Sequence, residues 1–306
     1  GGVLILGLGC ENNQVSAFTE VLGAYDAHRT RFLVAQECGD ELAGGDALLD
    51  ELCAVAAEDA RRTLPASKLC IGLKCGGSDG FSGITANPLI GAISDRLSSE
   101  GGAALMTEVP EMFGAETILM NRAKDKATFD KIVAMVNGFK EFYKRHDQVV
   151  YENPSPGNKA GGITTLEDKS LGCTQKGGFG LVNGVLTYGE QVRESGLNLC
   201  DGPGNDMAAC TVLAAAGAQM ILFSTGRGTP LGGPVPTMKI ATNSALAQKK
   251  PHWIDFDAGR LLSGENRDDV TRALFDDVLA VASGKQTASE RTNHREIAIF
   301  KTGVTL

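Results

Sequence analysis

The sequence has few of the features that mark nucleic-acid-binding, membrane or secreted proteins. It contains no run of Lys and Arg, and only one Trp and four Tyr, so nucleic acid is not an expected partner. No apolar stretch approaches the roughly 18 residues that a membrane-spanning helix needs. The sequence shows no signal peptide, and we therefore expect a cytoplasmic protein without a membrane partner.

The chain also lacks the common metal and nucleophile motifs. Its eight Cys form no C-x-x-C pair, and no Cys/His cluster has the spacing of a structural zinc site. The four His are scattered outside any H-E-x-x-H motif, and no G-x-S-x-G sequence marks a serine hydrolase. In a chain of this length without a secretion signal, we expect free thiols in a reducing compartment.

Glycine is the residue that the chain has in excess. Of the 306 residues, 39 are Gly, well above the usual share of about 7%, which indicates many tight turns and close backbone approaches. The 42% hydrophobic and 22% charged fractions are ordinary for a globular protein, and the net charge is −8. The chain begins Gly-Gly-Val without Met, so we expect it to be part of a longer protein.

In the first half, apolar segments that predict strands alternate with helical patterns. Apolar strands between helices favour a parallel sheet covered on both faces. The expected strands are 3–8, 31–36, 68–74 and 103–107, and the expected helices are 15–25, 47–62, 88–98 and 125–146.

The second half repeats this pattern less regularly, after a Pro/Gly/Asn-rich segment at 151–162 that suits a domain boundary. We therefore expect an α/β fold of two Rossmann-like units, residues 1–150 and 151–306, with mostly parallel sheets flanked by helices. The expected strands are 182–187, 197–200, 220–223, 237–241, 253–256 and an edge strand at 295–306, and the expected helices are 166–174, 207–216 and 268–283.

Two strand ends resemble each other and lead into polar turns. Gly7-Leu-Gly-Cys10 and Gly72-Leu-Lys-Cys75 both end a predicted strand, and ligands of open α/β sheets bind beyond such carboxyl ends. Cys10 and Cys75 are candidate soft metal ligands or nucleophiles, although no His lies near either in sequence. The alternative is that Cys and Gly simply pack well at strand ends.

Carboxylates follow the same strand ends. Glu11, Glu37, Asp79 and Glu108 each lie at or just beyond a predicted strand, where a carboxylate can bind a hard cation or move a proton. Taken singly, each has the alternative role of a helix cap or a solvated residue. As a set on one sheet edge they indicate a site.

Glycine-rich loops predict anion binding. Residues 75–88 combine Gly, Ser, Thr and Asn ahead of a predicted helix, and backbone N–H groups at a helix start bind carboxylate or phosphate. Neither this loop nor the first strand end completes a P-loop or a dinucleotide fingerprint, so we expect no ATP and no NAD. Lys159 and Arg227 lie in two further Gly-rich loops, where either side chain could bind a carboxylate. The alternative is that both are exposed charges on surface loops.

Four blocks, 9–14, 75–88, 154–162 and 225–230, resemble the altronate dehydratase/galactarate dehydratase family in order and spacing along essentially the whole chain. The tail from 295 onward is similar to the C-terminus of the altronate-dehydrating members. The resemblance implies dehydration of a sugar acid to a 2-keto-3-deoxy acid, as in the conversion of D-altronate to 2-dehydro-3-deoxy-D-gluconate in galacturonate breakdown. It also implies a divalent metal, Fe²⁺ or Mn²⁺, and a small N-terminal SAF domain that this chain does not include.

Motif membership and residue type together predict the site. The expected catalytic residues are Glu11, Asp79, Glu108 and Lys159; the expected substrate-binding residues are Asn12, Gln14, Ser78, Ser82, Thr85, Asn87, Asn158, Thr225, Arg227 and Thr229; the candidate metal ligands are Cys10, Glu11, Cys75, Asp79 and Glu108.

Several alternatives stay open at this point. The nearest are a galactarate dehydratase and the large subunit of a sulfolactate sulfo-lyase. A non-catalytic sugar-acid-binding module is an alternative of another class, and the glycine loops alone suggest a nucleotide-binding protein. The sequence does not give the oligomeric state, and a homo-oligomer stays open because exposed sheet edges in such proteins often pair.

Overall fold

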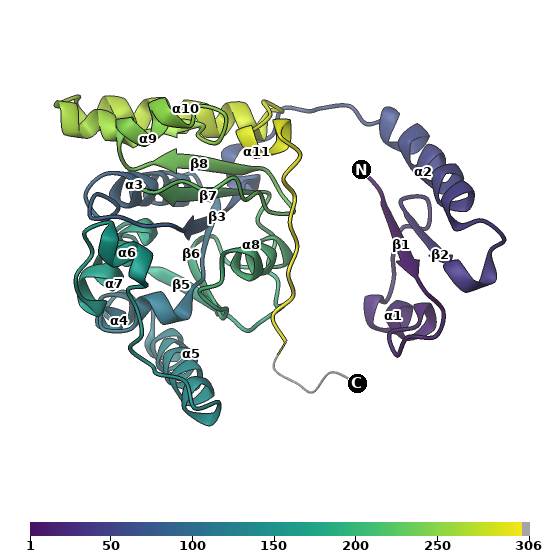
Figure 1. The fold of residues 1–306 in the computed structure, drawn as a ribbon, viewed down its shortest axis with the longest axis horizontal. Helices are drawn as coiled ribbons and strands as arrows, with labels where there is room; N and C mark the ends of the chain where they lie inside the picture. Colours follow the sequence, from purple (N-terminus) through teal and green to yellow (C-terminus); the bar gives the residue numbers. More distant parts are fainter. Residues whose placement is uncertain (302–306) are drawn as a thin grey trace. The chain divides into compact units, whose positions relative to one another are not determined.

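The computed structural model describes residues 1–301 and divides the chain into two compact units, Gly1–Leu64 and the part from Pro65 onward (Figure 1). The expected boundary near residue 150 is not where the structure divides. Strands from both sides of residue 150 pair with one another in a single sheet. The α/β class is confirmed, but the strands of the second half join those of 65–150 instead of forming a separate sheet.

The first unit is a small α/β layer. Its two strands pair in parallel, with Val3 opposite Thr30. Its second helix begins six residues earlier than expected, because the Asp40 side chain accepts hydrogen bonds from the backbone N–H groups of Leu42 and Ala43 and so caps the helix there. The elements are β1 (Val3–Gly7), α1 (Val15–Leu22), β2 (Thr30–Val34), η1 (Ala35–Glu37) and α2 (Glu41–Ala57).

The second unit is built on a seven-stranded sheet in the order β5-β6-β4-β3-β7-β8-β9, with every adjacent pair parallel. Its central strands are buried on both faces, as expected for near-continuous apolar runs. The strands are β3 (Cys70–Cys75), β4 (Ala103–Met106), β5 (Val182–Leu186), β6 (Gly196–Cys200), β7 (Met220–Thr225), β8 (Thr237–Ala241) and β9 (Phe256–Asp257).

Alternate strand residues supply the two apolar layers of this unit. Ile71 and Leu73 pack with α3, α5 and α10 in the larger core, whereas Cys70 and Phe223 pack with α8 in the smaller one. The helices and 3-10 turns are η2 (Ala66–Lys68), α3 (Ala86–Ser99), η3 (Val109–Met112), α4 (Glu116–Met120), α5 (Lys126–Arg145), α6 (Pro156–Ala160), α7 (Leu166–Thr174), η4 (Gln175–Gly177), α8 (Asp206–Ala215), α9 (Ser244–Lys249), η5 (Ala258–Ser263), α10 (Arg267–Ala282) and α11 (Ala288–Arg291).

Two adjacent strands create a switch point in this sheet. β3 lies between β4 and β7; the chain leaves β3 toward β4 on one side and leaves β7 toward β8 on the other. Loops at the carboxyl ends of such strands separate and open a crevice where ligands bind. The position of a site at this edge therefore follows from the strand order.

Two expected strands differ from the structure. The strand expected at 253–256 is reduced to β9, because residues 251–253 form a turn. Residues 295–301 form no strand, and the rest of the expected edge strand, 302–306, lies outside the described residues. Across residues 1–301, no helix combines the length and apolar character needed to cross a membrane.

Candidate active site

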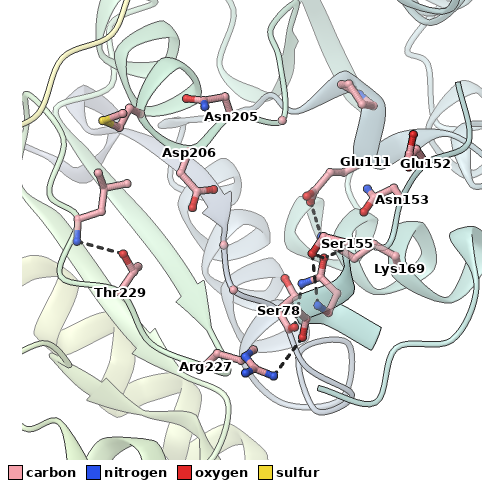
Figure 2. Close-up of a pocket in the computed structure, with 18 of the residues that line it drawn as sticks. Ser78, Glu111, Glu152, Asn153, Ser155, Lys169, Asn205, Asp206, Arg227 and Thr229 are labelled. Atoms are coloured by element: carbon pink, nitrogen blue, oxygen red, sulfur yellow. Dashed lines mark hydrogen bonds and ion pairs between the residues drawn. The ribbon is translucent and has the colours of Figure 1, made fainter. Parts of the chain in front are cut away.

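A cavity of about 980 Å³ opens at the switch point of the large sheet. Its wall comes from the loops that follow β3, β4, β6 and β7, together with α7 and the segment 148–158. Five charged side chains from different parts of the chain line it: Glu111, Glu152, Lys169, Asp206 and Arg227 (Figure 2). This volume is at the upper end of the range for small-molecule sites.

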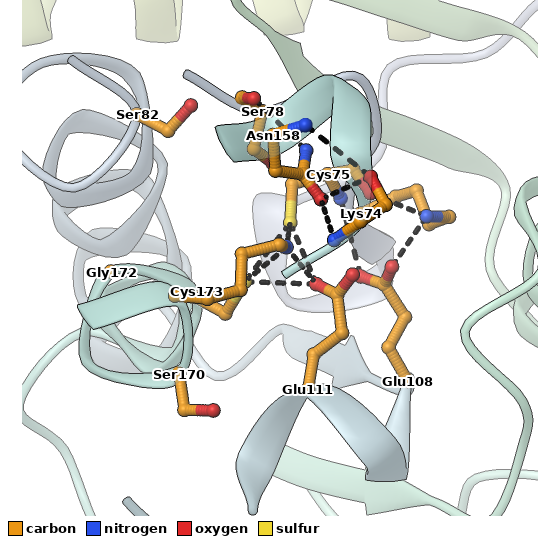
Figure 3. A network of polar contacts seen from close by, with 12 residues as sticks. Lys74, Cys75, Ser78, Ser82, Glu108, Glu111, Asn158, Ser170, Gly172 and Cys173 are labelled. Atoms are coloured by element: carbon orange, nitrogen blue, oxygen red, sulfur yellow. Dashed lines mark hydrogen bonds and ion pairs between the residues drawn. The ribbon is translucent and has the colours of Figure 1, made fainter. Parts of the chain in front are cut away.

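A group of ionisable side chains, which we call the charge cluster, extends from the cavity wall into the protein interior (Figure 3). It is assembled at the end of β3, in η3 with its preceding residue, and along α7 and η4. All of its members are nearly or fully buried. The cluster consists of Lys74, Cys75, Glu108, Glu111, Lys169, Cys173 and Lys176.

Glu108 joins two of the buried lysines. Its carboxylate pairs with Lys74 and, at 2.7 Å, with Lys176, and it also accepts from the backbone N–H of Cys75. Burial raises the pKa of Glu108 to about 7, with the neighbouring Glu111 acting in the same direction and the lysines opposing it. Glu108 has φ of 69°, a left-handed conformation that is costly for a residue with a side chain and is concentrated at functional sites.

Lys74 connects this buried carboxylate to the cavity. Its Nζ pairs with Glu108 and lies 2.7 Å from Asp206, whose side chain is 39% exposed and lines the cavity. Burial alone would lower the pKa of Lys74, but Glu108 and Asp206 raise it well above the ordinary value. Gly76 leaves space for this contact, because an added Cβ would lie 2.6 Å from the Asp206 carboxylate.

Three side chains of the cluster form a candidate metal site. Cys75 Sγ and Cys173 Sγ are 3.3 Å apart, and Glu111 Oε2 lies 3.1 Å from the first and 2.8 Å from the second. Donor atoms this close can share one ion, since thiolate ligands of a tetrahedral zinc are about 3.8 Å apart. Two sulfurs and a carboxylate oxygen are a donor set that divalent transition metals accept.

The electrostatics favour the charged forms of Cys75 and Glu111 and the neutral thiol of Cys173. A hydrogen bond with Cys173 lowers the pKa of the Cys75 thiol to about 5; burial opposes this shift, while Lys169 and Lys176 support it. Burial alone would raise the pKa of Glu111, but the same two lysines bring it below its ordinary value. The pKa of Cys173 is raised, by burial first and then by its contact with Cys75.

Two residues predicted from sequence, Cys75 and Glu108, lie in the charge cluster. Asp79 lies elsewhere: it accepts from Thr242 Oγ1 at 2.9 Å and from Asn243 Nδ2 at 3.1 Å, and it borders a smaller cavity of about 200 Å³. In this position Asp79 ties the loop after β3 to the end of β8.

The predicted substrate-binding residues fall into distinct groups. Ser78, Asn158, Arg227 and Thr229 line the large cavity, and Ser78 also lines the small one together with Ser82 and Asn87. Ser78 Oγ is buried and, within residues 1–301, has no hydrogen-bond partner. Arg227 is exposed and donates to the carbonyl of Gly157 at 3.1 Å.

Other predicted residues make contacts within the fold. Thr85 Oγ1 donates to the carbonyl of Thr242, and Thr225 Oγ1 accepts from the N–H of Gly228. Lys159 is exposed at the end of α6 and is not among the residues that border the large cavity in the described part of the chain.

The remaining predicted residues belong to the first unit. Glu11 accepts from the N–H groups of Leu8 and Gly9 and therefore closes the turn after β1. Hydrogen bonds from backbone N–H groups, first its own and then that of Gly9, lower its pKa. Cys10, Asn12 and Gln14 are exposed on the same turn. The two similar strand ends, at Cys10 and Cys75, therefore belong to separate units.

Most members of the site were not predicted from sequence. Lys74, Glu111, Lys169, Cys173, Lys176 and Asp206 were not among the candidates. One signal was available for three of them, because Lys169, Cys173 and Lys176 follow one another at spacings of four and three, which places them on one face of a helix. Nothing in the local sequence indicates that this face meets Cys75.

Comparison with known proteins gives matches along the whole chain. Residues 66–305 match the family model described as D-galactarate/Altronate dehydratase, C-terminal, and residues 1–57 match D-galactarate dehydratase/Altronate hydrolase, second domain. An altronate dehydratase of Escherichia coli (strain K12) is 58% identical over 306 residues, which is 100% of this chain and 62% of that protein.

Two further relatives extend this comparison. An altronate dehydratase of Bacillus subtilis (strain 168) is 56% identical over 307 residues, 100% of this chain and 62% of the relative. A galactarate dehydratase (L-threo-forming) of Escherichia coli (strain K12) is 32% identical over 314 residues, 98% of this chain and 60% of the relative. The chain therefore spans about three fifths of the length of these curated relatives.

Proposed function

Because the chain belongs to the D-galactarate/altronate dehydratase family, we propose that it carries the catalytic centre of a hydro-lyase that converts D-altronate to 2-dehydro-3-deoxy-D-gluconate. The observation that carries this proposal is the 56–58% identity to two altronate dehydratases over the whole chain. Identity to the galactarate dehydratase is lower, at 32%. Galactarate is therefore the second candidate substrate.

The reaction needs positive charge beside the substrate. Removing the proton next to a carboxylate concentrates negative charge on that end of the sugar acid, so a cation or metal there lowers the barrier. We assign Arg227, whose planar fork suits a carboxylate, to the substrate's carboxylate end. Ser78, Asn158 and Thr229 border the same cavity and supply neutral groups for the sugar hydroxyls.

We assign proton transfer to two charged side chains that border the cavity. Asp206 and Lys169 both border the cavity, and each is held by an ion pair, Asp206 with Lys74 and Lys169 with Glu111. One group would accept the C2 proton, and the other would assist departure of the C3 hydroxyl. Glu108 keeps Lys74 in place from behind.

We propose Cys75, Glu111 and Cys173 as the ligands of the divalent metal. Between the two metals expected for the family, this donor set favours Fe²⁺ over Mn²⁺, because thiolate sulfur prefers iron and Mn²⁺ prefers oxygen ligands. When bound, the metal would supply Lewis acidity beside the developing charge. Elemental analysis of the protein should find iron, which Cys173→Ala should lose; metal retained by Cys173→Ala would contradict this ligand set.

The other predicted residues keep their assigned roles as proposals. Glu11, Asn12, Gln14, Asp79 and Lys159 are expected to contribute to substrate binding or proton transfer, and alanine variants would test each of them. The cytoplasmic location and an N-terminal SAF domain as a partner of this region also stay predictions, and self-association stays open.

A substrate panel tests the proposed function. The protein, expressed from its intact coding sequence, is offered altronate, galactarate and sulfolactate, and 2-keto-3-deoxy acid or sulfite is measured. Altronate should give the highest kcat/KM. Sulfite release would favour the sulfo-lyase alternative, and binding of altronate with no product would favour a non-catalytic module.

Arg227→Lys tests the assignment of the carboxylate end. It should lower kcat/KM for altronate about tenfold or more, because Lys cannot form the bidentate contact. Arg193→Lys is the matched control, since Arg193 is exposed and outside the cavity wall. Equal activity of the two variants would remove Arg227 from the site.

A further inference from the structure

Lys169 places its ammonium among the three donors of the candidate metal site. Its Nζ lies 2.7 Å from Glu111 Oε2, 3.0 Å from Cys173 Sγ and 3.7 Å from Cys75 Sγ. The side chain is 3% exposed. A positive charge is therefore already in contact with every atom that a metal would bind.

The other two lysines of the cluster are arranged differently. Lys176 Nζ lies 3.0 Å from Cys75 Sγ, but its ion pair is with Glu108. Lys74 pairs with Glu108 and Asp206. Among the described residues, Lys169 is the lysine that pairs with Glu111 and contacts both sulfurs.

Burial explains why a cation is needed at this position. A carboxylate such as that of Glu111 is costly to bury unless a positive charge compensates it. The ammonium of Lys169 provides that compensation. A divalent ion would provide the same compensation from the same three atoms, and two cations cannot share them because like charges at such short range repel strongly.

We propose that the Lys169 ammonium and a divalent metal ion compete for the site formed by Cys75, Glu111 and Cys173, so that metal binding releases the lysine side chain. Open space beside Lys169 exists in the two cavities that it borders. If the proposed function holds, the released amine is available for the proton transfer assigned to Lys169. The exchange itself does not depend on the substrate.

Metal affinity gives the first test. The reduced, chelator-treated protein is titrated with Co²⁺, followed by the cobalt–thiolate absorption and by competition with a chromophoric chelator. Lys169→Met should bind Co²⁺ about tenfold more tightly or better than the unmutated protein, since its competing cation is gone. Lys169→Arg, which keeps a cation, should not show this gain.

Two matched variants separate occupancy of the site from general electrostatics. Lys176→Met removes a neighbouring charge without vacating the position between the donors, so its gain in affinity should be smaller. Lys140→Met removes a half-buried lysine that pairs with Glu116 and should leave affinity unchanged. Equal affinities of Lys169→Met and the unmutated protein would overturn the proposal.

A second test uses the unmutated protein and so does not depend on a variant that folds. Acetylation of lysines is followed by peptide mass spectrometry, with and without saturating Zn²⁺. Zinc should increase labelling of Lys169 several-fold and leave Lys74 and Lys176 protected, since these two keep their carboxylate partners. Labelling of Lys169 that zinc leaves unchanged or lowers would overturn the proposal.

A variant that lacks the two proposed cysteine ligands of the metal gives a third test. Cys75→Ala/Cys173→Ala should abolish both the cobalt–thiolate absorption and the zinc-dependent labelling of Lys169. Zinc-dependent labelling that persists in this variant would overturn the proposed exchange. Because none of these measurements includes substrate, failure of the exchange is distinguishable from failure of the altronate assay.

Discussion

At the scale of single residues, Glu108 is the anion on which two buried cations depend. It pairs with both Lys74 and Lys176, and no part of its side chain is exposed. Removing one partner of a buried ion pair leaves an uncompensated charge, which costs more than the pair itself contributes.

We expect Glu108→Gln to lower the free energy of unfolding by about 3–5 kcal/mol, the range for a broken buried pair. Urea unfolding followed by circular dichroism measures this. Glu100→Gln is the control, because Glu100 is exposed at the end of α3 and should have little effect. Similar stability of the two variants would contradict the pairing.

Lys239 shows the opposite situation, a buried lysine with a weak partner. Its side chain is fully buried on β8 and donates only to the carbonyl of Pro230, at 3.4 Å, among the described residues. Burial lowers its pKa from 10.5 to about 8, although Asp255 opposes the shift. The charged lysine therefore destabilises the fold at neutral pH.

The pH dependence follows from this shift. Between pH 8 and 10.5 the unfolded chain binds more protons at Lys239 than the folded protein does, so this residue makes the free energy of unfolding rise with pH in that window. Lys239→Met lacks this contribution. The free energy of unfolding of Lys239→Met should exceed that of the unmutated protein by on the order of 2 kcal/mol at pH 7. This difference should shrink by pH 10.

Urea unfolding at both pH values tests this prediction. Lys131→Met, which changes an exposed lysine on α5, should track the unmutated protein at each pH. A stability difference for Lys239→Met that does not change with pH would show that the charge of Lys239 is not the cause.

At the scale of elements, two helical glycines have opposite surroundings. An added Cβ at Gly91 in α3 would lie 2.2 Å from the carbonyl oxygen of Gln175, whereas Gly138 in α5 has nothing within 4 Å. The close approach at Gly91 lets α3 pack against η4, which carries Lys176 of the charge cluster.

We expect Gly91→Ala to destabilise the protein by about 1–3 kcal/mol, because overpacking forces α3 and η4 apart. Gly138→Ala should stabilise it by about 0.5–1 kcal/mol through the better helix propensity of Ala. Thermal unfolding of both variants measures the difference. Equal gains in both would mean that α3 and η4 separate without cost.

At the scale of the whole molecule, the division at residue 64 predicts where proteolysis begins. Residues 59–65 lie outside helices and strands, and they include the exposed Arg61 and Arg62. Brief trypsin treatment of the folded protein should cut there first and leave the second unit as one cooperatively folded fragment. First cleavage after Lys144 or Arg145 would instead favour the boundary near residue 150.

The sequence predicted much of this organisation. Local periodicity located most strands and helices, with α7 placed at its observed bounds, and the motif blocks indicated the family that the comparisons confirm. The boundary was missed because Pro/Gly-rich segments also occur as loops inside a domain, and 151–162 contributes to the cavity wall. The start of α2 was missed because Gly44 and Gly45 interrupt its helical pattern.

By itself, the sequence determined the fold class, the family and the candidates Cys75 and Glu108, because these depend on neighbouring residues and short contiguous motifs. Only the tertiary structure decided that Glu111 and Cys173 meet Cys75. They are 36 and 98 positions from it in the chain. Local sequence patterns do not predict contacts between residues so far apart. Parallel strand order brings the carboxyl ends of β3 and β4 to one edge, and the packing of α7 against η3 completes the site there.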